Sequence, residues 1–159
     1  MIKGYLFDNN HVSAWYNRVP KVLAKVRSLP KGTLICTCAT VLGEVEAGYA
    51  ITQSTNLDIR EDYIRWLNEQ FLANCLEVTT STRIAYAEII GRLWARNPPR
   101  PGTKMKTERH LVQNFGIDIN DVWIAACARE HNLVLVTHDA MEKIREVIAP
   151  DFLAIECWI

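Results

Sequence analysis

Short apolar runs alternate with longer amphipathic segments along the chain. Apolar or β-branched runs that predict strands occupy residues 2–7, 33–38, 75–79, 133–137 and 152–158. Apolar residues recur at helical spacing in residues 12–28, which Pro20 divides, and in 41–52, 58–73, 80–95 and 121–130. About five strands that alternate with helices of this length predict an α/β fold with a mostly parallel sheet covered on both faces, and residues 152–158 are its expected edge strand.

Polar residues mark the places where several helices are expected to begin. The expected N-caps are Thr40, Thr80 or Ser81, and Asn120. After Ala95 the Pro-rich run 97–102 cannot continue a helix. Residues 97–114 are therefore expected to form a long basic connection.

Length and composition predict one domain. A chain of 159 residues with 49% hydrophobic and 23% charged content can build one ordinary core, so residues 1–159 are expected to form a single domain. The five cysteines form an odd set, and no secretory signal pattern opens the chain. No apolar run approaches the roughly 20 residues of a membrane span. We expect a cytoplasmic protein with no membrane segment.

Four acidic residues stand where the predicted fold could bring them together. Asp8 follows the first expected strand, Asp139 follows the fourth, and Glu44 and Asp121 lie on expected helices. The carboxyl ends of parallel strands meet at one edge of a sheet, where ligands bind. Clustered carboxylates repel one another unless they hold a cation, and oxygen ligands suit Mg²⁺ or Mn²⁺. The sequence therefore predicts an acidic metal pocket.

Each of these acids also has a purely local explanation. Asp8 and Asp139 would cap the helices that follow them. Asp121, in the first turn of its helix, would interact favourably with the positive end of the helix dipole. Glu44 is harder to explain in this way, because it lies among apolar neighbours, and a buried carboxylate is costly unless it is paired or binds a cation. Glu46 on the same segment is expected to be solvated.

The motifs that carry these acids resemble a known family. The first strand ends in Asp8-Asn9-Asn10, and the runs 42–48, 121–128 and 135–139 follow in order. In these residues the chain resembles PIN-domain ribonucleases and, within them, the VapC-type toxins of bacterial toxin–antitoxin pairs. The resemblance implies a PIN-like three-layer α/β/α sandwich. It also implies that Asp8, Glu44, Asp121 and Asp139 bind Mg²⁺ or Mn²⁺ and cut RNA.

The resemblance carries further expectations about the site and its partners. It implies a metal-dependent endoribonuclease that hydrolyses phosphodiester bonds in RNA such as tRNA or rRNA, as the toxin of a VapBC-type pair. A VapB-type antitoxin and a homodimer built on helical faces follow from it. The further candidates beside the metal are Asp118, Thr137 and Asn9. Asn9 stands where the family often has Asp or Thr, and the fourth acid is often Asn in the family.

Basic residues gather between Arg83 and Arg109, where seven stand against two acidic ones. The candidate RNA-binding residues are Arg92, Arg96, Arg100, Lys104, Lys106 and Arg109. Trp94 would stack on a base if it were exposed. The alternative is a solvated charged loop with Trp94 in the core.

Other classes of protein fit the sequence less well. No Gly-rich phosphate loop and no Gly-x-Ser-x-Gly elbow occurs, which disfavours nucleotide-triphosphate enzymes and acyl-transfer hydrolases. Cys36 and Cys38 lack a second Cys/His pair for zinc and are expected to be buried thiols. A catalytically silent PIN-like module that binds RNA or a protein remains the alternative. A receiver-type phosphoacceptor domain ranks third, because Asp8 is followed by asparagines.

Overall fold

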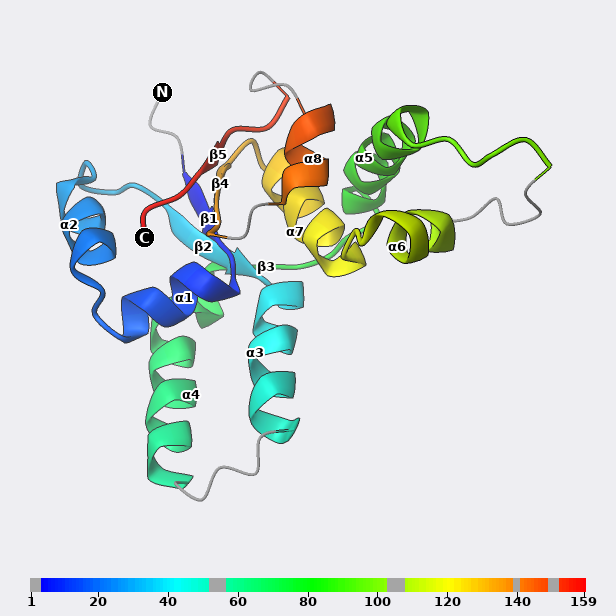
Figure 1. Ribbon diagram of the computed structural model, residues 1–159. Coiled ribbons are helices and arrows are strands. Elements are labelled where there is room, and N and C mark those ends of the chain that lie inside the picture. The colour runs from blue at the N-terminus through cyan, green and yellow to red at the C-terminus, as the bar shows by residue number, and fades with distance from the viewer. Residues whose placement is uncertain (1–3, 52–56, 103–107, 139–140, 149–151) are drawn as a thin grey trace.

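The computed structural model describes residues 4–51, 57–102, 108–138, 141–148 and 152–159 (Figure 1). Its five strands are β1 (Tyr5–Phe7), β2 (Ile35–Cys38), β3 (Cys75–Leu76), β4 (Val134–Val136) and β5 (Ile155–Glu156). They form one sheet in the order β3-β2-β1-β4-β5, and every neighbouring pair is parallel. The predicted α/β class and the parallel five-stranded sheet with β5 at one edge are confirmed.

The helices follow the strands in an order that places them on both faces of the sheet. They are α1 (Asn9–Tyr16), α2 (Pro20–Ser28), α3 (Ala39–Ile51), α4 (Leu57–Phe71), α5 (Thr82–Arg96), α6 (Arg109–Phe115), α7 (Ile119–Glu130) and α8 (Glu142–Val147). A short 3₁₀ turn at Leu72–Asn74 precedes β3. Right-handed crossovers from β1 to β2 and β3 run one way, and those to β4 and β5 run the other way. The result is the three-layer α/β/α arrangement, with α1–α4 on one face and α5–α8 on the other.

The order of the strands switches direction between β1 and β4. These strands are neighbours, but the connection that leaves β1 runs toward β2 and the one that leaves β4 runs toward β5. In open parallel sheets, ligands bind at such a switch point, beyond the carboxyl ends of the strands. The register pairs Phe7 with Val136, so Asp8 and Thr137 are the residues that emerge there side by side.

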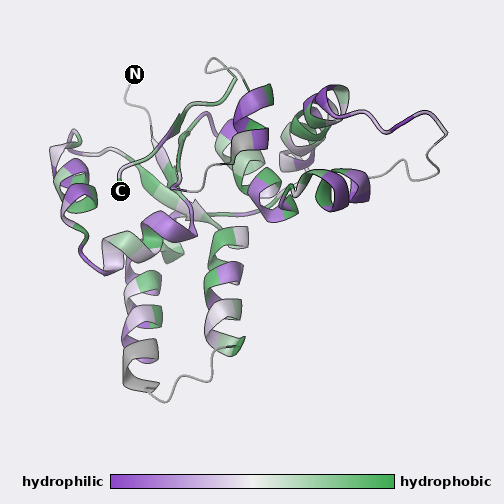
Figure 2. Cartoon of the chain, in the orientation of Figure 1, coloured by the Kyte–Doolittle hydropathy of each residue, from purple (hydrophilic) through white to green (hydrophobic). Residues whose placement is uncertain are grey.

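The core lies between the layers and is continued by an aromatic cluster under α1. Leu6, Phe7 and Leu135 are fully buried in the sheet, whose strands are mostly hydrophobic in Figure 2, and α7 buries most of its length. Trp15 of α1 contacts Trp66 and Phe71 edge to face. No helix in the described ranges is long and apolar enough to span a membrane.

Several predicted helix starts are wrong because the cap lies earlier in the chain. The predicted helix at Val12 begins at Asn9, since Asp8 caps it. The predicted cap Asn120 lies inside α7, and Asp118 is the cap, accepting from the Asn120 backbone N–H at 2.8 Å. In each case an aspartate that ends the extended segment accepts the first free N–H groups of the helix.

Two other expected caps are also corrected. Thr40 lies inside α3, which begins at Ala39, so it is not the cap that the sequence predicted. At α5, the Thr79 hydroxyl accepts from the backbone N–H groups of Ser81 and Thr82, and Ser81 makes no side-chain cap. A hydroxyl two or three residues before the helix reaches these donors as well as an adjacent one does.

The basic connection predicted over residues 97–114 contains a helix. α6 begins at Arg109, and its end is marked by Gly116, which has a left-handed backbone (φ 64°). His110 anchors α6, since its ring packs 5.5 Å from Trp94 and its Nε2 lies 3.2 Å from the Asn97 carbonyl oxygen. The prediction failed because α6 has seven residues, too few for a clear helical period.

Candidate functional site

Asp8 stands just beyond the carboxyl end of β1, at the switch point between β1 and β4. The residue is only 3% exposed. Its carboxylate Oδ1 accepts a hydrogen bond from the backbone N–H of His11 at 3.1 Å, which caps α1. Capping therefore occurs, as the local explanation of Asp8 expects, and it leaves Oδ2 for a partner on the neighbouring strand.

Thr137 and His11 hold the Asp8 carboxylate from two directions. The buried Thr137 hydroxyl, just beyond β4, donates a hydrogen bond to Asp8 Oδ2. The fully buried His11 ring has Nδ1 3.4 Å from Asp8 Oδ1, and its Nε2 accepts from the backbone N–H of Trp158 at 3.0 Å. Because Nε2 is the acceptor, a neutral ring carries its proton on Nδ1, directed at Asp8. Asp8 is thus fixed where β1, β4 and the C-terminal segment meet.

Glu44 and Asp121 bring two further carboxylates to the contact between α3 and α7. Asn120 Nδ2 donates a hydrogen bond to Glu44 Oε1 at 2.8 Å, and Asp121 is the next residue in the first turn of α7. Glu44 and Asp121 are half-buried, whereas Glu46 is exposed, as predicted. Helix α3 contacts both α7 and α1, the helix that Asp8 caps. The three acids therefore stand on neighbouring elements.

The donor set fits a hard divalent cation in its chemistry. Asp8, Glu44 and Asp121 offer only carboxylate oxygens, which Mg²⁺ and Mn²⁺ prefer. Asp139 lies outside the described residues. Within the described part of the chain, no three His, Cys, Asp or Glu side chains gather closely enough to hold a metal ion. The ligand role of the four acids therefore stays a prediction.

Asn9 and Asp118 stand at the starts of α1 and α7, where each has a local role. The Asn9 side-chain oxygen accepts a hydrogen bond from the Ser13 hydroxyl at 3.5 Å. Asp118 is exposed and caps α7. These contacts account for both residues locally, and a place beside a metal stays a prediction for both.

The cations expected to bind RNA lie on α5, on α6 and in the segment between them. Arg96, Arg100 and Arg109 are exposed, while Lys104 and Lys106 lie outside the described residues. Arg92 pairs with Glu88 at 3.2 Å, and its guanidinium lies 4.1 Å from the Phe152 ring centroid. Arg92 is therefore engaged within the fold. The half-buried Trp94 packs on the core and on His110, which favours its structural alternative.

Three buried thiols lie on β2 and α7, and two of them, Cys38 and Cys127, are hydrogen-bonded to each other. Cys36, Cys38 and Cys127 are fully buried, as predicted for the first two. A hydrogen bond to Cys38, with burial, raises the pKa of Cys127, so its thiol stays protonated. These thiols are therefore part of the packing between β2, α3 and α7.

The sequence did not predict three contacts near Asp8 and Glu44. His11 contacts Asp8, Asn120 contacts Glu44, and Trp158 contacts His11. His11 follows Asp8 by three residues, the spacing of a cap partner, and this signal was available. Asn120 was expected only as a cap. Trp158 gave no signal, because its backbone contact with His11 joins positions 147 residues apart.

Comparisons with known proteins agree with this fold. The PIN domain family model matches residues 5–147. VapBC2 from Rickettsia felis, bound to a promoter DNA fragment, is similar with a TM-score of 0.69 and 18% identity, covering 98% of each chain. VapBC-1 from nontypeable Haemophilus influenzae is similar with a TM-score of 0.66 and 21% identity, covering 97% of each chain. VapBC-5 from Mycobacterium tuberculosis, of the VapBC family of toxin–antitoxin systems, has a TM-score of 0.59 and 19% identity, covering 99% of this chain and 98% of that one. No curated protein matches the sequence.

The family match defines the class of this protein. The match spans β1 to α8 and includes the positions of all four acids. The chain belongs to the PIN-domain family. Its structural neighbours are below 25% identity, so they establish the shared fold and nothing about substrate.

Proposed function

We propose that this protein is a metal-dependent endoribonuclease that hydrolyses RNA phosphodiester bonds. The observation that supports this most is the position of Asp8, a nearly buried carboxylate held by Thr137 and His11 at the β1/β4 switch point. A carboxylate that is buried at a switch point, where parallel sheets bind ligands, suits a ligand-binding role in addition to its role as the cap of α1. The chain also belongs to the PIN-domain family, which generally consists of nucleases, and this membership supports a role in phosphodiester hydrolysis.

The carboxylates would serve as ligands and not as nucleophiles. Asp8, Glu44 and Asp121, with Asp139, would hold Mg²⁺ or Mn²⁺. When bound, such an ion supplies a water of lowered pKa and neutralises charge on the phosphate. Thr137 and His11 would fix the direction of the Asp8 oxygens, and Asn120 would do the same for Glu44.

The biological role we propose is the toxin of a VapBC-type pair. The similar structures are VapBC assemblies, and the match covers nearly the whole chain. A VapB-type antitoxin and a homodimer would accompany that role. Cleavage of a structured RNA such as tRNA or rRNA is the corresponding substrate proposal.

A catalytically silent PIN-like module that binds RNA or a protein is the second candidate. The observation that favours it is that the described residues bring no three potential ligands together. The two candidates differ in one measurable property, which is cleavage that depends on a divalent ion.

The test compares carboxylate variants in an RNA cleavage assay. Asp8→Asn and Glu44→Gln remove one charge each with almost no change of shape, and Glu46→Gln is the matched control on the exposed face of the same helix. We expect cleavage of tRNA with Mg²⁺ or Mn²⁺ that a chelator stops. Asp8→Asn and Glu44→Gln should lower it by roughly 100-fold or more, and Glu46→Gln should leave it unchanged.

Each result of that assay separates the candidates. Equal cleavage by the parent chain and by Asp8→Asn would assign the activity to a contaminant or to another site. No cleavage of tRNA, rRNA or total RNA by the folded parent chain with either ion would contradict the nuclease and leave the silent module.

A further inference from the structure

Helix α2 and its flanks carry a second concentration of positive charge. Arg18, Lys21, Lys25, Arg27 and Lys31, here called the α2 surface, are all exposed. Residues 9–43 contain no Asp or Glu, although basic and acidic residues balance at 18 each over the whole chain. None of the ion pairs between described residues involves the α2 surface. The cations of the α2 surface therefore have no ion-pair partner among the described residues.

An open groove of about 370 Å³ lies between α2 and the C-terminal strand. It is lined by Lys21, Lys25, Glu156, Cys157 and Trp158. Lys25 Nζ lies 5.5 Å from the Trp158 ring centroid. Within the described residues, the lining includes one carboxylate, that of Glu156, whose Oε2 accepts a hydrogen bond from Trp158 Nε1 at 2.8 Å and which forms no ion pair with either lysine. The groove therefore presents two lysines at helical spacing beside an aromatic residue.

The groove adjoins the candidate site through a single side chain. The Trp158 backbone N–H donates to His11 Nε2 at 3.0 Å, and His11 Nδ1 lies 3.4 Å from Asp8 Oδ1. Two contacts, from Trp158 to His11 and from His11 to Asp8, therefore link a residue of the groove lining to the Asp8 carboxylate.

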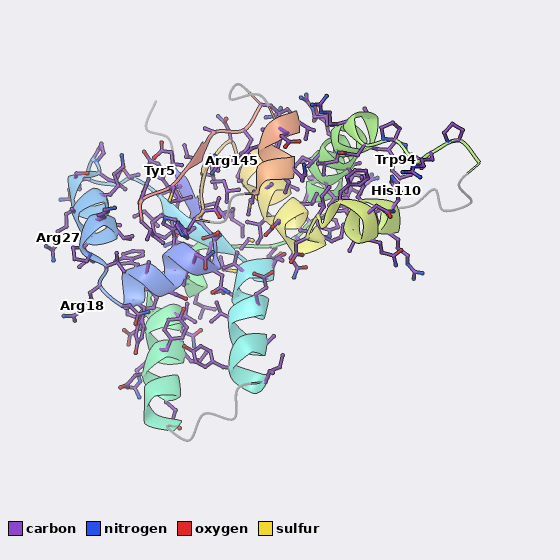
Figure 3. All side chains as sticks on the ribbon, in the orientation of Figure 1. Tyr5, Arg18, Arg27, Trp94, His110 and Arg145 are labelled. Atoms are coloured by element: carbon purple, nitrogen blue, oxygen red, sulfur yellow. The ribbon has the colours of Figure 1, made fainter. Side chains whose placement is uncertain are left out.

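The α2 surface is far from the cations that the sequence singled out. In Figure 3, Arg18 and Arg27 project from one end of the molecule, and Trp94 and His110 lie toward the other end. The C-terminus lies between α2 and the sheet (Figure 1). Contacts link Lys25 of the α2 surface to Trp158, Trp158 to His11, and His11 to Asp8.

We propose that the α2 surface binds the phosphate backbone of the substrate RNA and directs the strand along the groove to Asp8. This inference rests on the proposed function. Uncompensated cations attract nucleic acid by neutralising phosphates and releasing counterions. They would also offset the repulsion between RNA and the acidic pocket.

The composition of the surface favours RNA over a protein partner. Protein interfaces are anchored by exposed aromatic or aliphatic side chains. The exposed large hydrophobic residues of the described chain are Leu34, Ile51, Leu72, Val78, Ile84, Val112 and Ile159, and none of them lies on α2. Charge without apolar anchors is the pattern of phosphate binding.

Substitution of Arg18 can remove a positive charge without lowering the stability of the fold. It has a left-handed backbone (φ 56°) at the end of α1, where its N–H bonds the Trp15 carbonyl and the Val19 N–H bonds that of Ala14. Glycine adopts this conformation without strain. Arg18→Gly should therefore weaken RNA binding while the fold keeps or gains stability, which a merely structural role for Arg18 would not produce.

The first experiment measures RNA affinity without cleavage. A fluorescent single-stranded RNA is titrated with the full chain in a chelator, from 50 mM to 300 mM salt. Each lost phosphate contact lowers the log–log salt slope by roughly 0.7 for a single strand. Lys21→Gln with Lys25→Gln should lower it by roughly 1.4 and weaken binding by roughly 25-fold at 0.1 M salt. Lys143→Gln, which removes a lysine paired with Glu146, is the control and should bind like the parent chain.

The second experiment locates the RNA in the groove. Cys157 lines the groove and is exposed, whereas Cys36, Cys38 and Cys127 are fully buried. Bound RNA should slow the reaction of Cys157 with a maleimide several-fold in the parent chain. It should not do so in the Lys21→Gln/Lys25→Gln variant at the same RNA concentration.

The outcomes decide the proposal independently of catalysis. Unchanged affinity and salt slope in the double lysine variant would overturn it, as would RNA that binds but leaves Cys157 fully reactive. A parent chain that binds no RNA at 50 mM salt would overturn it as well, even if the cleavage assay with a metal ion succeeded. Loss of binding to a protein partner, with RNA binding intact, would assign the α2 surface to that partner instead.

Discussion

Replacement of Asp8 tests whether its carboxylate has a structural role or is a charge that the fold tolerates. Asp8→Ala removes the cap of α1, worth about 1 kcal/mol. It also removes the hydrogen bond from the Thr137 hydroxyl to a charged acceptor, worth about 1.5–3 kcal/mol. The opposing effect is the relief of repulsion from nearby carboxylates. Because Asp8 is held by three donors, we expect the first two losses to dominate.

The expected cost of Asp8→Ala is therefore about 3 kcal/mol, from the cap and hydrogen-bond values together. For a domain of this size the unfolding midpoint should fall by roughly 6–12 °C. Asp8→Asn keeps an acceptor for the cap and a polar group for Thr137, so it should cost about 1 kcal/mol or less. Urea and thermal unfolding of the three proteins in a chelator would measure both differences.

A divalent ion adds a second arm to the same measurement. If Asp8 is a ligand, Mg²⁺ or Mn²⁺ at about 100 times its dissociation constant should stabilise the parent chain by about 2.7 kcal/mol. Asp8→Asn should lose most of that gain. An Asp8→Ala protein as stable as the parent chain in the chelator would refute the structural reasoning. Equal stabilisation of parent and Asp8→Asn by metal would refute the ligand role.

Two further predictions concern the joint of α5 with α7 and the buried thiols. Thr82→Val should cost about 1–3 kcal/mol in urea unfolding, because the buried Thr82 hydroxyl donates to Glu130 Oε2 at 2.5 Å; an unchanged free energy of unfolding would contradict this. Burial, followed by the neighbouring thiols Cys38 and Cys75, raises the pKa of Cys36 from 9.0 to about 12. The Cys36 thiol therefore holds its proton more tightly in the folded chain than in the unfolded chain. The stability that this difference gives the folded state is complete below pH 9.0 and is lost as the pH rises toward about 12. Between pH 8 and 10.5, Cys36→Ser should lose less stability than the parent chain, by about 1.4 kcal/mol per pH unit above 9 at most; parallel losses would contradict it.

The sequence by itself determined the order of strands and helices and the places where acids stand relative to them. Periodicity is a local property, so the strands at 2–7 and 133–137 and the amphipathic helix near 58–73 were predictable within a few residues. Asp8 after a strand and Glu46 on an exposed face followed from the same pattern. The failures at Asn120 and Thr40 are local as well, because several neighbouring polar groups compete for the same free N–H groups and packing selects one.

Only the tertiary structure decided what surrounds those acids. The hydrogen bond between Asn120 and Glu44 joins residues 76 positions apart, and the one between Trp158 and His11 joins residues 147 apart. Such contacts depend on the order of the strands in the sheet, which switches direction between the parallel neighbours β1 and β4 and is set by the packing of whole layers and not by any short segment. The groove beside α2 also depends on long-range packing, since its lining joins Lys21 and Lys25 of α2 to Glu156, Cys157 and Trp158. The sequence therefore determined which groups could take part, and long-range packing decided which of them meet.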